Sequence, residues 1–297
     1  MTEQSNTGGT FTLRDTSITL NRMGYGTMQL AGREGDKVVW GPPRDVPGAI
    51  AILREAVAFG VNHIDTSDYY GPHVTNQLIK QALHPYPDDL TIVTKVGARR
   101  GSDGSWPHAR SRREIIDAVH DNLRNLGLEA LDVVNLRLGG FAEPTDEPFE
   151  EPLAALAELK QQGLIRHIGL STVSLKQLAL AQVITEIVCI QNFYNVAQRS
   201  DDGFIDTLAA EGIAFVPYFP LGGFSPLQSS KLDAIAASLE ATPMQVALAW
   251  LLQRSPNILL IPGTSSVNHL RENLAAATLE LPKEALGELD SIGVAAA

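Results

Sequence analysis

Eight short apolar runs recur along the 297-residue chain, and helical patterns fill most of the segments between them. Several runs are apolar at nearly every position, which is typical of parallel strands covered on both faces. This alternation predicts an α/β protein, and eight repeats predict one closed (β/α)8 TIM barrel. The runs are "MGYGTM", "VNHID", "TIVTK", "LDVVNL", "RHIGL", "IVCI", "IAFVP" and "ILLIP".

The signals between the runs support a single domain over residues 1–297. Ser111 and Glu114 form a capping box before an apolar helical pattern that ends at Gly127. The segment "FTLRDTSITLNRMG" alternates in strand fashion, so residues 1–22 are predicted to form a tail and a β-hairpin outside the barrel. Extra helices are expected near the C-terminus, the last of them in "PKEALGELDSIG".

A doubly wound open sheet is the rival architecture. It would usually carry a glycine fingerprint at the first strand-to-helix turn. The stretch "GYGTMQ" provides Gly24 and Gly26 but no third glycine, and no helix follows directly. The barrel is therefore favoured.

Charge and composition restrict the partners and the compartment. A net charge of -11 repels phosphate backbones, so nucleic-acid binding is not expected. The single cysteine, Cys189, excludes an internal disulfide and fits a reducing compartment. No apolar run approaches the ~18 residues that span a bilayer, and the first residues do not resemble a signal peptide. We expect a cytoplasmic protein that binds no membrane.

Barrel geometry selects candidate site residues, because reactive groups lie at the C-terminal ends of barrel strands and in the loops that follow. A carboxylate, two phenols, an ammonium and a guanidinium thereby converge on one mouth. The strand-end candidates are Asp65, Tyr69, Tyr70, Lys95, Arg137, Ser171, Thr172, Gln191, Tyr218 and residues 263 to 266.

This set of groups suits proton transfer. A free tyrosine has a pKa of ~10, and a nearby lysine or arginine is expected to lower it. Asp65 could hold Lys95 charged and oriented, so that a phenol serves as general acid. No metal is expected, because His63 beside Asp65 has no evident third ligand and is predicted to be a core histidine.

Aromatic residues in the neighbouring loops are candidates for the substrate pocket. The basic loop of residues 97 to 113 could place Trp106 or His108 over a substrate, although a solvated loop is the alternative. Trp40, after the first strand, and Tyr69 could form further pocket walls.

The sequence motifs at the strand ends resemble those of the aldo-keto reductases. The matching motifs are "GVNHIDTSDYYG", "TIVTKVG", "LDVVNLR", "IGLST", "IQNFYN", "VPYFPLGG" and "IPGTSSVNHLRENLAAA", in the family's order from Leu20 to Leu281. The resemblance implies a β/α barrel that binds a nicotinamide cofactor without a Rossmann domain. It also implies a catalytic tetrad of Asp, Tyr, Lys and His, with the tyrosine five residues after the aspartate, which selects Tyr70 over Tyr69.

The fourth tetrad position departs from the family, because Arg137 stands where a histidine is usual. Arginine can donate hydrogen bonds to a carbonyl but is always charged and cannot relay a proton. We therefore expect Asp65, Tyr70, Lys95 and Arg137 to be catalytic, with Arg137 polarising the carbonyl. The segments "GLIRHIGLS" and "YFPLGGFSPLQS" are similar to the bacterial branch of the family that reduces pyridoxal.

The resemblance also assigns the cofactor positions, and it implies NADPH rather than NADH because a helix N-terminus would attract the 2′-phosphate. The residues that it places against the cofactor are Gly26, Thr27, Asp65, Ser171, Thr172, Gln191, Tyr218, Pro220, Leu221, Gly222, Gly263, Thr264, Ser265, His269, Arg271, Glu272 and Asn273.

The sequence thus predicts an NADPH-dependent reductase of aldehydes or ketones, acting on a small-molecule carbonyl as a monomer or weak homo-oligomer. One alternative is a nicotinamide-binding sensor that acts through a protein partner without turnover. Another is a barrel lyase that uses Lys95 as a Schiff-base nucleophile, although a neighbouring Asp65 would keep that amine protonated.

Overall fold

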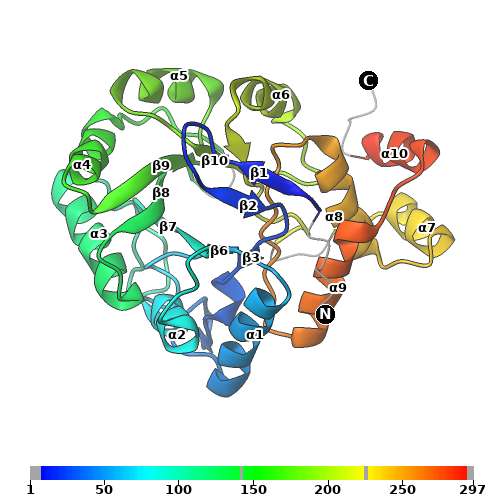
Figure 1. Cartoon of the computed structure of the whole chain (residues 1–297), viewed down its shortest axis with the longest axis horizontal. Coiled ribbons are helices and arrows are strands. Elements are labelled where there is room, and N and C mark those ends of the chain that lie inside the picture. Colours follow the sequence, from blue (N-terminus) through cyan, green and yellow to red (C-terminus); the bar gives the residue numbers. More distant parts are fainter. Residues whose placement is uncertain (1–7, 141–142, 224–226, 293–297) are drawn as a thin grey trace.

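A parallel seven-stranded sheet forms the centre of the molecule, surrounded by helices (Figure 1). The computed structural model describes residues 8–140, 143–223 and 227–292; residues 1–7 of the predicted tail lie outside these ranges. The spatial order is β11-β10-β9-β8-β7-β6-β3. The strands are β3 (Tyr25–Gly26), β6 (His63–Asp65), β7 (Thr91–Val96), β8 (Leu131–Arg137), β9 (Ile165–Ser171), β10 (Cys189–Gln191) and β11 (Ala214–Phe215).

The run "ILLIP" joins the two edges of this sheet. Ile258 forms a parallel bridge with Phe215 of β11, and Leu260 bridges Met23; Gly263, directly after the run, bridges Gly26 of β3. The eighth predicted strand therefore occupies its expected place but contributes isolated bridges instead of a regular strand. The barrel prediction is confirmed in this form, with seven strands and a bridging segment.

Helices follow the strands and enclose the sheet. The capping box of Ser111 and Glu114 opens α3 as predicted, and Gly127 ends it with a φ of 70°. Helix α8 begins with a second capping box, formed by Thr242 and Gln245. The helices are α1 (Val46–Ala58), α2 (Val74–Leu83), α3 (Arg112–Leu126), α4 (Glu150–Gln161), α5 (Leu175–Ile184), α6 (Asp202–Glu211), α7 (Ser230–Ser238), α8 (Pro243–Arg254), α9 (Val267–Ala275) and α10 (Lys283–Asp290), with 3-10 turns η1 (Met28–Leu30) and η2 (Ala276–Thr278).

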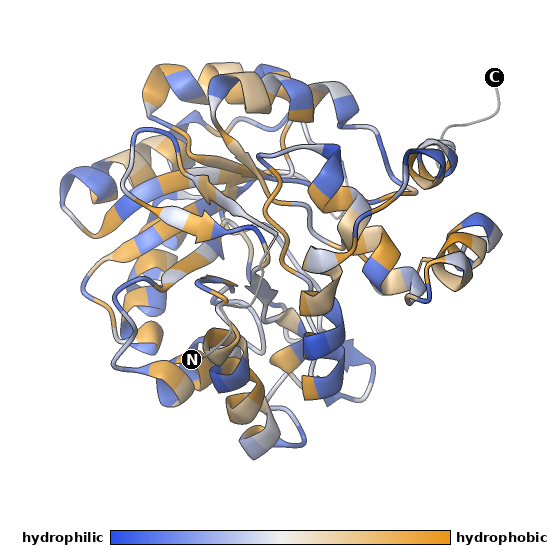
Figure 2. Cartoon of the chain, turned by 45° about the vertical axis from the view of Figure 1, so that its right-hand side comes forward, coloured by the Kyte–Doolittle hydropathy of each residue, from blue (hydrophilic) through white to orange (hydrophobic). Residues whose placement is uncertain are grey.

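Hydropathy follows this arrangement. The strands of the sheet are mostly apolar, whereas the surrounding helices show alternating polar and apolar residues (Figure 2). Such helices bury one stripe against the sheet and expose the other. None of the helices in the described ranges has both the length and the apolar composition to cross a bilayer alone; α7 and α8 pass such a test together, but with a bend of 92°.

The predicted N-terminal hairpin covers one end of the barrel. Strands β1 (Thr10–Thr12) and β2 (Thr19–Asn21) pair antiparallel and lie across the near end of the sheet in Figure 1. Leu13 and Leu20 are 2% and 1% exposed and pack with Val93 and Val133 from the barrel strands. The hairpin thus forms an apolar floor to the barrel.

A second hairpin was not predicted from the sequence. Strands β4 (Arg33–Glu34) and β5 (Lys37–Val38) pair antiparallel across Gly35 and Asp36. A Gly-Asp pair between two short runs is a known hairpin signal, and Gly35 has the positive φ, 56°, that such a turn needs.

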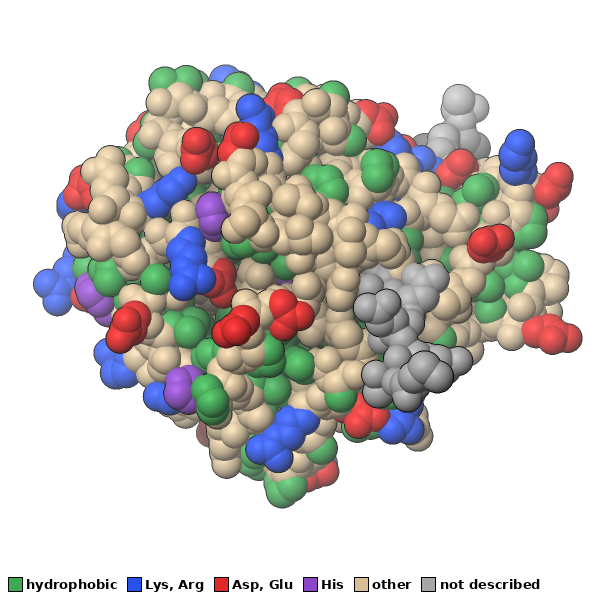
Figure 3. Space-filling model, viewed as in Figure 1, with side chains coloured by type: hydrophobic (Ala, Val, Ile, Leu, Met, Phe, Trp, Pro, Cys, Tyr) green, Lys and Arg blue, Asp and Glu red, His purple; other side chains and the backbone are tan. Residues whose placement is uncertain are grey.

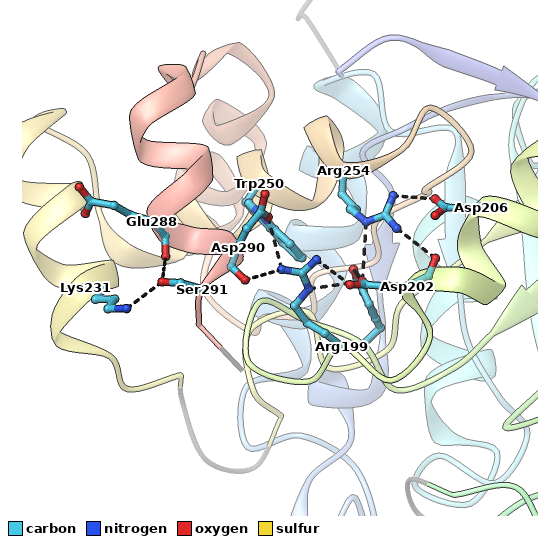
Figure 4. A network of polar contacts seen from close by, with 10 residues as sticks. Arg199, Asp202, Asp206, Lys231, Trp250, Arg254, Glu288, Asp290 and Ser291 are labelled. Atoms are coloured by element: carbon cyan, nitrogen blue, oxygen red, sulfur yellow. Dashed lines mark hydrogen bonds and ion pairs between the residues drawn. The ribbon is translucent and has the colours of Figure 1, made fainter. Parts of the chain in front are cut away.

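A polar network holds the C-terminal helix against the barrel helices (Figure 4). Arg199 donates to Asp202 at 2.6 Å and to the backbone oxygen of Asp290 at 2.8 Å. Arg254 donates to Asp206 at 2.8 Å, and the Trp250 indole donates to Asp290 at 2.9 Å. On the face in Figure 3, acidic and basic side chains are interspersed, so this face has no large area of one sign.

Candidate active site

A buried carboxylate–ammonium pair lies where β6 and β7 end. Asp65 and Lys95 are each 3% exposed, and the Lys95 Nζ donates to Asp65 Oδ1 at 2.5 Å and to the Thr66 carbonyl at 3.0 Å. The other carboxylate oxygen accepts a hydrogen bond from Gln191 Nε2 at 2.8 Å. A buried charge pair is tolerated only when its remaining hydrogen-bonding groups are satisfied in this way. The pairing also agrees with a protonated Lys95, which disfavours its use as a Schiff-base nucleophile.

Tyr70 lies against this pair. The Lys95 Nζ is 5.2 Å from the centroid of the Tyr70 ring, and Tyr69 packs edge-on against Tyr70 with ring centroids 5.4 Å apart. No hydrogen bond joins the Lys95 ammonium to the Tyr70 hydroxyl in the described part of the chain. The two groups therefore meet through the face of the ring.

The predicted lowering of the Tyr70 pKa is wrong for this structure. Burial raises the pKa most, Asp65 raises it further, and Arg137 lowers it by less. The ammonium of Lys95 is compensated by Asp65, so the positive charge expected to favour the phenolate is offset next to the ring. Tyr70 is thus held as a protonated phenol at neutral pH.

Arg137 ends β8 and adds a permanent positive charge to the same place. One of its Nη atoms donates to the Gly140 carbonyl at 2.6 Å. Burial acts to lower the pKa of its guanidinium, but the phenols of Tyr69, Tyr218 and Tyr70 leave the pKa raised overall. Among the described residues, no carboxylate pairs with Arg137.

A cavity of about 360 Å³ brings these groups together. Asp65, Tyr70, Lys95 and Arg137 all contribute to its wall, as the sequence predicts for one barrel mouth. The other lining residues are Gly26, Met28, Gln29, Val38, Tyr69, Trp106, His108, Gly139, Gly140, Gln191, Tyr218, Phe219, Pro220, Leu221, Gly223, Ile261, Pro262 and Gly263.

The predicted substrate-pocket residues divide into two groups. Tyr69, Trp106 and His108 line the cavity, and the rings of Tyr69 and Trp106 meet edge-to-face at 5.7 Å. Trp40 does not line it; this ring instead packs beside the Lys37 ammonium at 4.7 Å and the Arg100 guanidinium at 5.3 Å.

Several lining residues were missed by sequence reasoning. Val38 reaches the cavity from the unpredicted hairpin β4–β5, and Gly139 and Gly140 follow β8 directly. The Gly-Asp turn signal would have found Val38, and the strand-end rule would have found the two glycines.

The inner cofactor positions fit a nicotinamide group. Gly26, Asp65, Gln191, Tyr218, Pro220, Leu221 and Gly263 line the cavity. The buried atoms Ser171 Oγ and Gln191 Oε1 have no hydrogen-bond partner among the described residues. A carboxamide offers both an N–H donor and a carbonyl acceptor, so it would satisfy this pair of buried groups.

The outer cofactor positions lie away from the cavity wall. Thr27 and Thr172 are buried, and their hydroxyls contact the Asp65 carbonyl at 3.0 Å and the Tyr218 hydroxyl at 3.2 Å. Gly222, Thr264 and Ser265 also lie outside the set of lining residues.

Two of the four predicted cofactor residues on α9 already have side-chain partners in this structure. Arg271 forms an ion pair with Glu55, and Glu272 accepts a hydrogen bond from Thr242 at 2.7 Å. His269 is exposed, and Asn273 is buried. Arg271 and Glu272 would have to leave these partners before they could contact an adenosine group.

A parallel β/α barrel with an aspartate, a tyrosine and a lysine around one cavity at its strand ends defines a class of barrel oxidoreductases. Residues 22–294 match the aldo/keto reductase family, and the chain belongs to this family. The predictions of an oxidoreductase and of the family's NADPH-dependent carbonyl reduction are confirmed at the level of the family.

Individual relatives give the same result. The chain is 65% identical to the pyridoxine 4-dehydrogenase of Escherichia coli strain K12, over 95% of this chain and 98% of that protein. This confirms the resemblance to the pyridoxal-reducing branch. A thermostable aldo-keto reductase solved with the inhibitor epalrestat superposes with a TM-score of 0.81 at 32% identity, covering 96% of this chain and all (100%) of that chain. The holo form of an aldo-keto reductase from Bacillus halodurans superposes with a TM-score of 0.78 at 25% identity, covering 97% of each chain.

Proposed function

We propose that this protein reduces the aldehyde of pyridoxal to the alcohol of pyridoxine, with NADPH as its reductant. The observation that carries the proposal is the shared cavity wall of Tyr70, Lys95, Asp65 and Arg137. The 65% identity to a pyridoxine 4-dehydrogenase supports the choice of substrate.

The residues with unmet hydrogen-bonding capacity would hold the cofactor. Bound NADPH supplies a hydride for the carbonyl carbon. Gln191 and Ser171 would hold the carboxamide through the two oxygens that have no partner in the described part of the chain. Tyr218 lines the cavity and would present an aromatic face to the nicotinamide ring. Its ring is stacked against Phe193, with an angle of 15° between the two ring planes.

Tyr70 would supply the proton. When the carbonyl carbon gains a hydride, its oxygen gains the electron pair of the C=O π bond and becomes a strong base. Such an oxygen is about as basic as hydroxide and is a stronger base than a phenolate. The raised pKa of Tyr70 keeps the phenol protonated, and transfer of its proton to the alkoxide remains favourable.

Arg137 would be the main group that stabilises the phenolate left by the transfer, and Lys95, whose charge Asp65 offsets, would contribute less. Lys95 lies over the ring at 5.2 Å, and Arg137 lowers the pKa of Tyr70 even before reaction. Asp65 holds the Lys95 ammonium in place through its 2.5 Å contact. Arg137 would also donate to the substrate carbonyl and polarise it, the role that histidine has elsewhere in the family.

The test is NADPH oxidation by the purified protein with pyridoxal, with pyridoxine identified by chromatography. We expect NADPH to be consumed in step with pyridoxine formed, and NADH to be used less well. Turnover of other aldehydes but not of pyridoxal would contradict the proposal that pyridoxal is the substrate. Tight NADPH binding with no turnover of any aldehyde would instead support the alternative of a nicotinamide-binding sensor that acts through a protein partner.

We also propose that the protein works in the cytoplasm as a monomer or weak homo-oligomer. Its only cysteine, Cys189, is buried, and burial raises the thiol pKa to about 12, so the group is not suited to redox chemistry. Leu175, Leu180 and Val183 are the large apolar side chains most exposed in the described residues, and all three lie on α5. Light scattering over a concentration series should show a monomer with at most weak association.

A further inference from the structure

Arg137, which lines the cavity, differs from Arg100 and Arg110 of the neighbouring loop in how its charge is compensated. Arg110 pairs with Glu147, and Arg100 donates to the carbonyls of Val38, Val39 and Gly104 while lying 3.7 Å from the Trp106 ring. In the described ranges, Arg137 donates to the Gly140 carbonyl and interacts with the neutral Tyr69 phenol, and it has no carboxylate partner. A largely buried charge without a counter-ion is costly, so an anionic ligand would be favoured beside it.

The shape of the guanidinium specifies the kind of anion. The group has five N–H donors in a planar fork; the Gly140 carbonyl and the Tyr69 phenol are its neighbouring partners, so donors remain for a ligand. A fork binds two neighbouring oxygens at once, which a histidine ring cannot do. The carbonyl oxygen of a substrate would be one of the two.

The rest of the wall favours a flat aromatic substrate. Tyr69 and Trp106 present rings to the cavity, and Val38 and Met28 add apolar surface. An aromatic aldehyde that carries a hydroxyl on the adjacent ring carbon supplies two oxygens at neighbouring positions. That hydroxyl is acidic, because the ring and the carbonyl both delocalise its negative charge.

We propose that Arg137 selects aromatic aldehydes with an ionised oxygen ortho to the carbonyl, by binding both oxygens with one guanidinium. Pyridoxal belongs to this class, so the inference rests on the proposed function and extends it. The chemistry also explains why a permanent charge is useful. An ortho oxyanion donates electrons to the carbonyl and makes it a poorer hydride acceptor, and the guanidinium offsets this effect. A histidine, with an ordinary pKa near 6.5, would be mostly neutral at pH 7 and would offset it less.

The first test uses the unaltered enzyme and three aldehydes: 2-hydroxybenzaldehyde, 2-methoxybenzaldehyde and 4-hydroxybenzaldehyde. The methoxy compound cannot ionise, and the 4-hydroxy compound ionises at a distant position. We expect kcat/KM to be about 10- to 100-fold higher for the 2-hydroxy compound, because a hydrogen bond to a charged group is lost in the other two. This advantage should grow as the pH rises through the pKa of the substrate hydroxyl. Equal kcat/KM for the three compounds overturns the inference.

The second test replaces the arginine. Arg137→Gln can still donate to Gly140 but lacks the charge, and Arg137→Lys keeps the charge but lacks the fork. For Arg137→Gln we expect the advantage of 2-hydroxy over 2-methoxybenzaldehyde to disappear, and for Arg137→Lys to shrink. If both substrates lose the same factor, Arg137 is a general polarising group and the selection is refuted.

Failure of the proposed function has a different signature. An enzyme that oxidises NADPH with none of these aldehydes and not with pyridoxal would contradict the reductase itself. An enzyme that reduces pyridoxal and all three benzaldehydes without preference would retain the reductase and lose only the ortho selection. A thermal unfolding curve for each variant identifies loss of folding, and the three-substrate comparison with the unaltered protein does not depend on any variant.

Discussion

Two polar regions of this protein differ in how far their hydrogen-bonding groups are satisfied. In the network around α6, α8 and α10, Arg199 and Arg254 are matched by Asp202, Asp206 and Asp290 (Figure 4). At the cavity, Arg137 lacks an acidic partner and Gln191 Oε1 lacks a hydrogen bond within the described chain; Ser171 Oγ also lacks one, although Ser171 is not among the lining residues. Polar groups that a fold leaves unmatched identify where a ligand completes the structure.

Unmatched groups alone do not define a site, as His63 shows. Neither ring nitrogen has a partner among the residues that the structure describes, yet His63 is 1% exposed and does not line the cavity. Burial lowers its pKa to about 4, so it is a neutral core residue, as the sequence predicts. A ligand site is therefore identified by a cavity together with polar groups that lack hydrogen bonds.

The largest expected effect comes from breaking the buried pair at the mouth. Lys95→Met would leave the Asp65 carboxylate buried without its cation, which costs about 3–5 kcal/mol of unfolding free energy. Urea unfolding of the variant and the parent measures this cost. A loss below 1 kcal/mol would mean that the pair behaves like one on the surface. Lys95→Met with Asp65→Asn should recover part of the stability without recovering turnover.

The next effect concerns the two neighbouring tyrosines. Tyr70→Phe should lower kcat by at least about 10², because the general acid is lost, while fluorescence titration shows unchanged NADPH binding. Tyr69→Phe is the matched control at the adjacent position and should lose much less. If the larger loss followed Tyr69, the five-residue spacing from Asp65 would have selected the wrong phenol.

The dependence of stability on pH would test whether His63 is a neutral core residue and not part of the site. The folded pKa of His63, about 4, lies below the ordinary histidine pKa of 6.5, so the unfolded chain binds more protons between these values. Stability should fall as the pH falls from about 6.5 to about 4, with this group adding up to about 1.4 kcal/mol per pH unit. Unfolding free energies of the parent and His63→Gln across this range measure the difference in slope. Identical slopes would mean that His63 accepts a proton in the folded state.

The smallest effect is expected in the matched network. Asp290→Asn removes one half-exposed partner of Arg199, and such contacts are each worth about 0.2–1 kcal/mol. Thermal unfolding should detect this small loss, and kcat/KM for pyridoxal should not change. An altered kcat/KM would break the comparison, since it would couple the network to the cavity.

Local sequence signals predicted most of the fold. The capping box at Ser111 and the first seven apolar runs depend on residues close together in the chain, and the structure confirms them. The last run became a set of bridges because it meets β3 and β11, a relation that no local pattern contains. The hairpin β4–β5 was missed although its Gly-Asp turn signal was present.

The site was predictable as a set of residues but not in its electrostatics. Strand ends placed Asp65, Lys95 and Arg137 on one cavity. The direction of the Tyr70 pKa depends on how deeply the ring is buried and on how far Asp65 compensates the lysine, which are properties of the folded chain. Arg271 could not be seen to pair with Glu55, because 216 positions separate them.

The apolar plug formed by β1 and β2 has a kinetic consequence. Leu13 and Leu20 close one end of the barrel, so we expect the reductant and the aldehyde to enter through the cavity at the strand ends. Whichever molecule enters second obstructs the departure of the first. Turnover should therefore follow a compulsory order, with each product released in turn before the next pair can load.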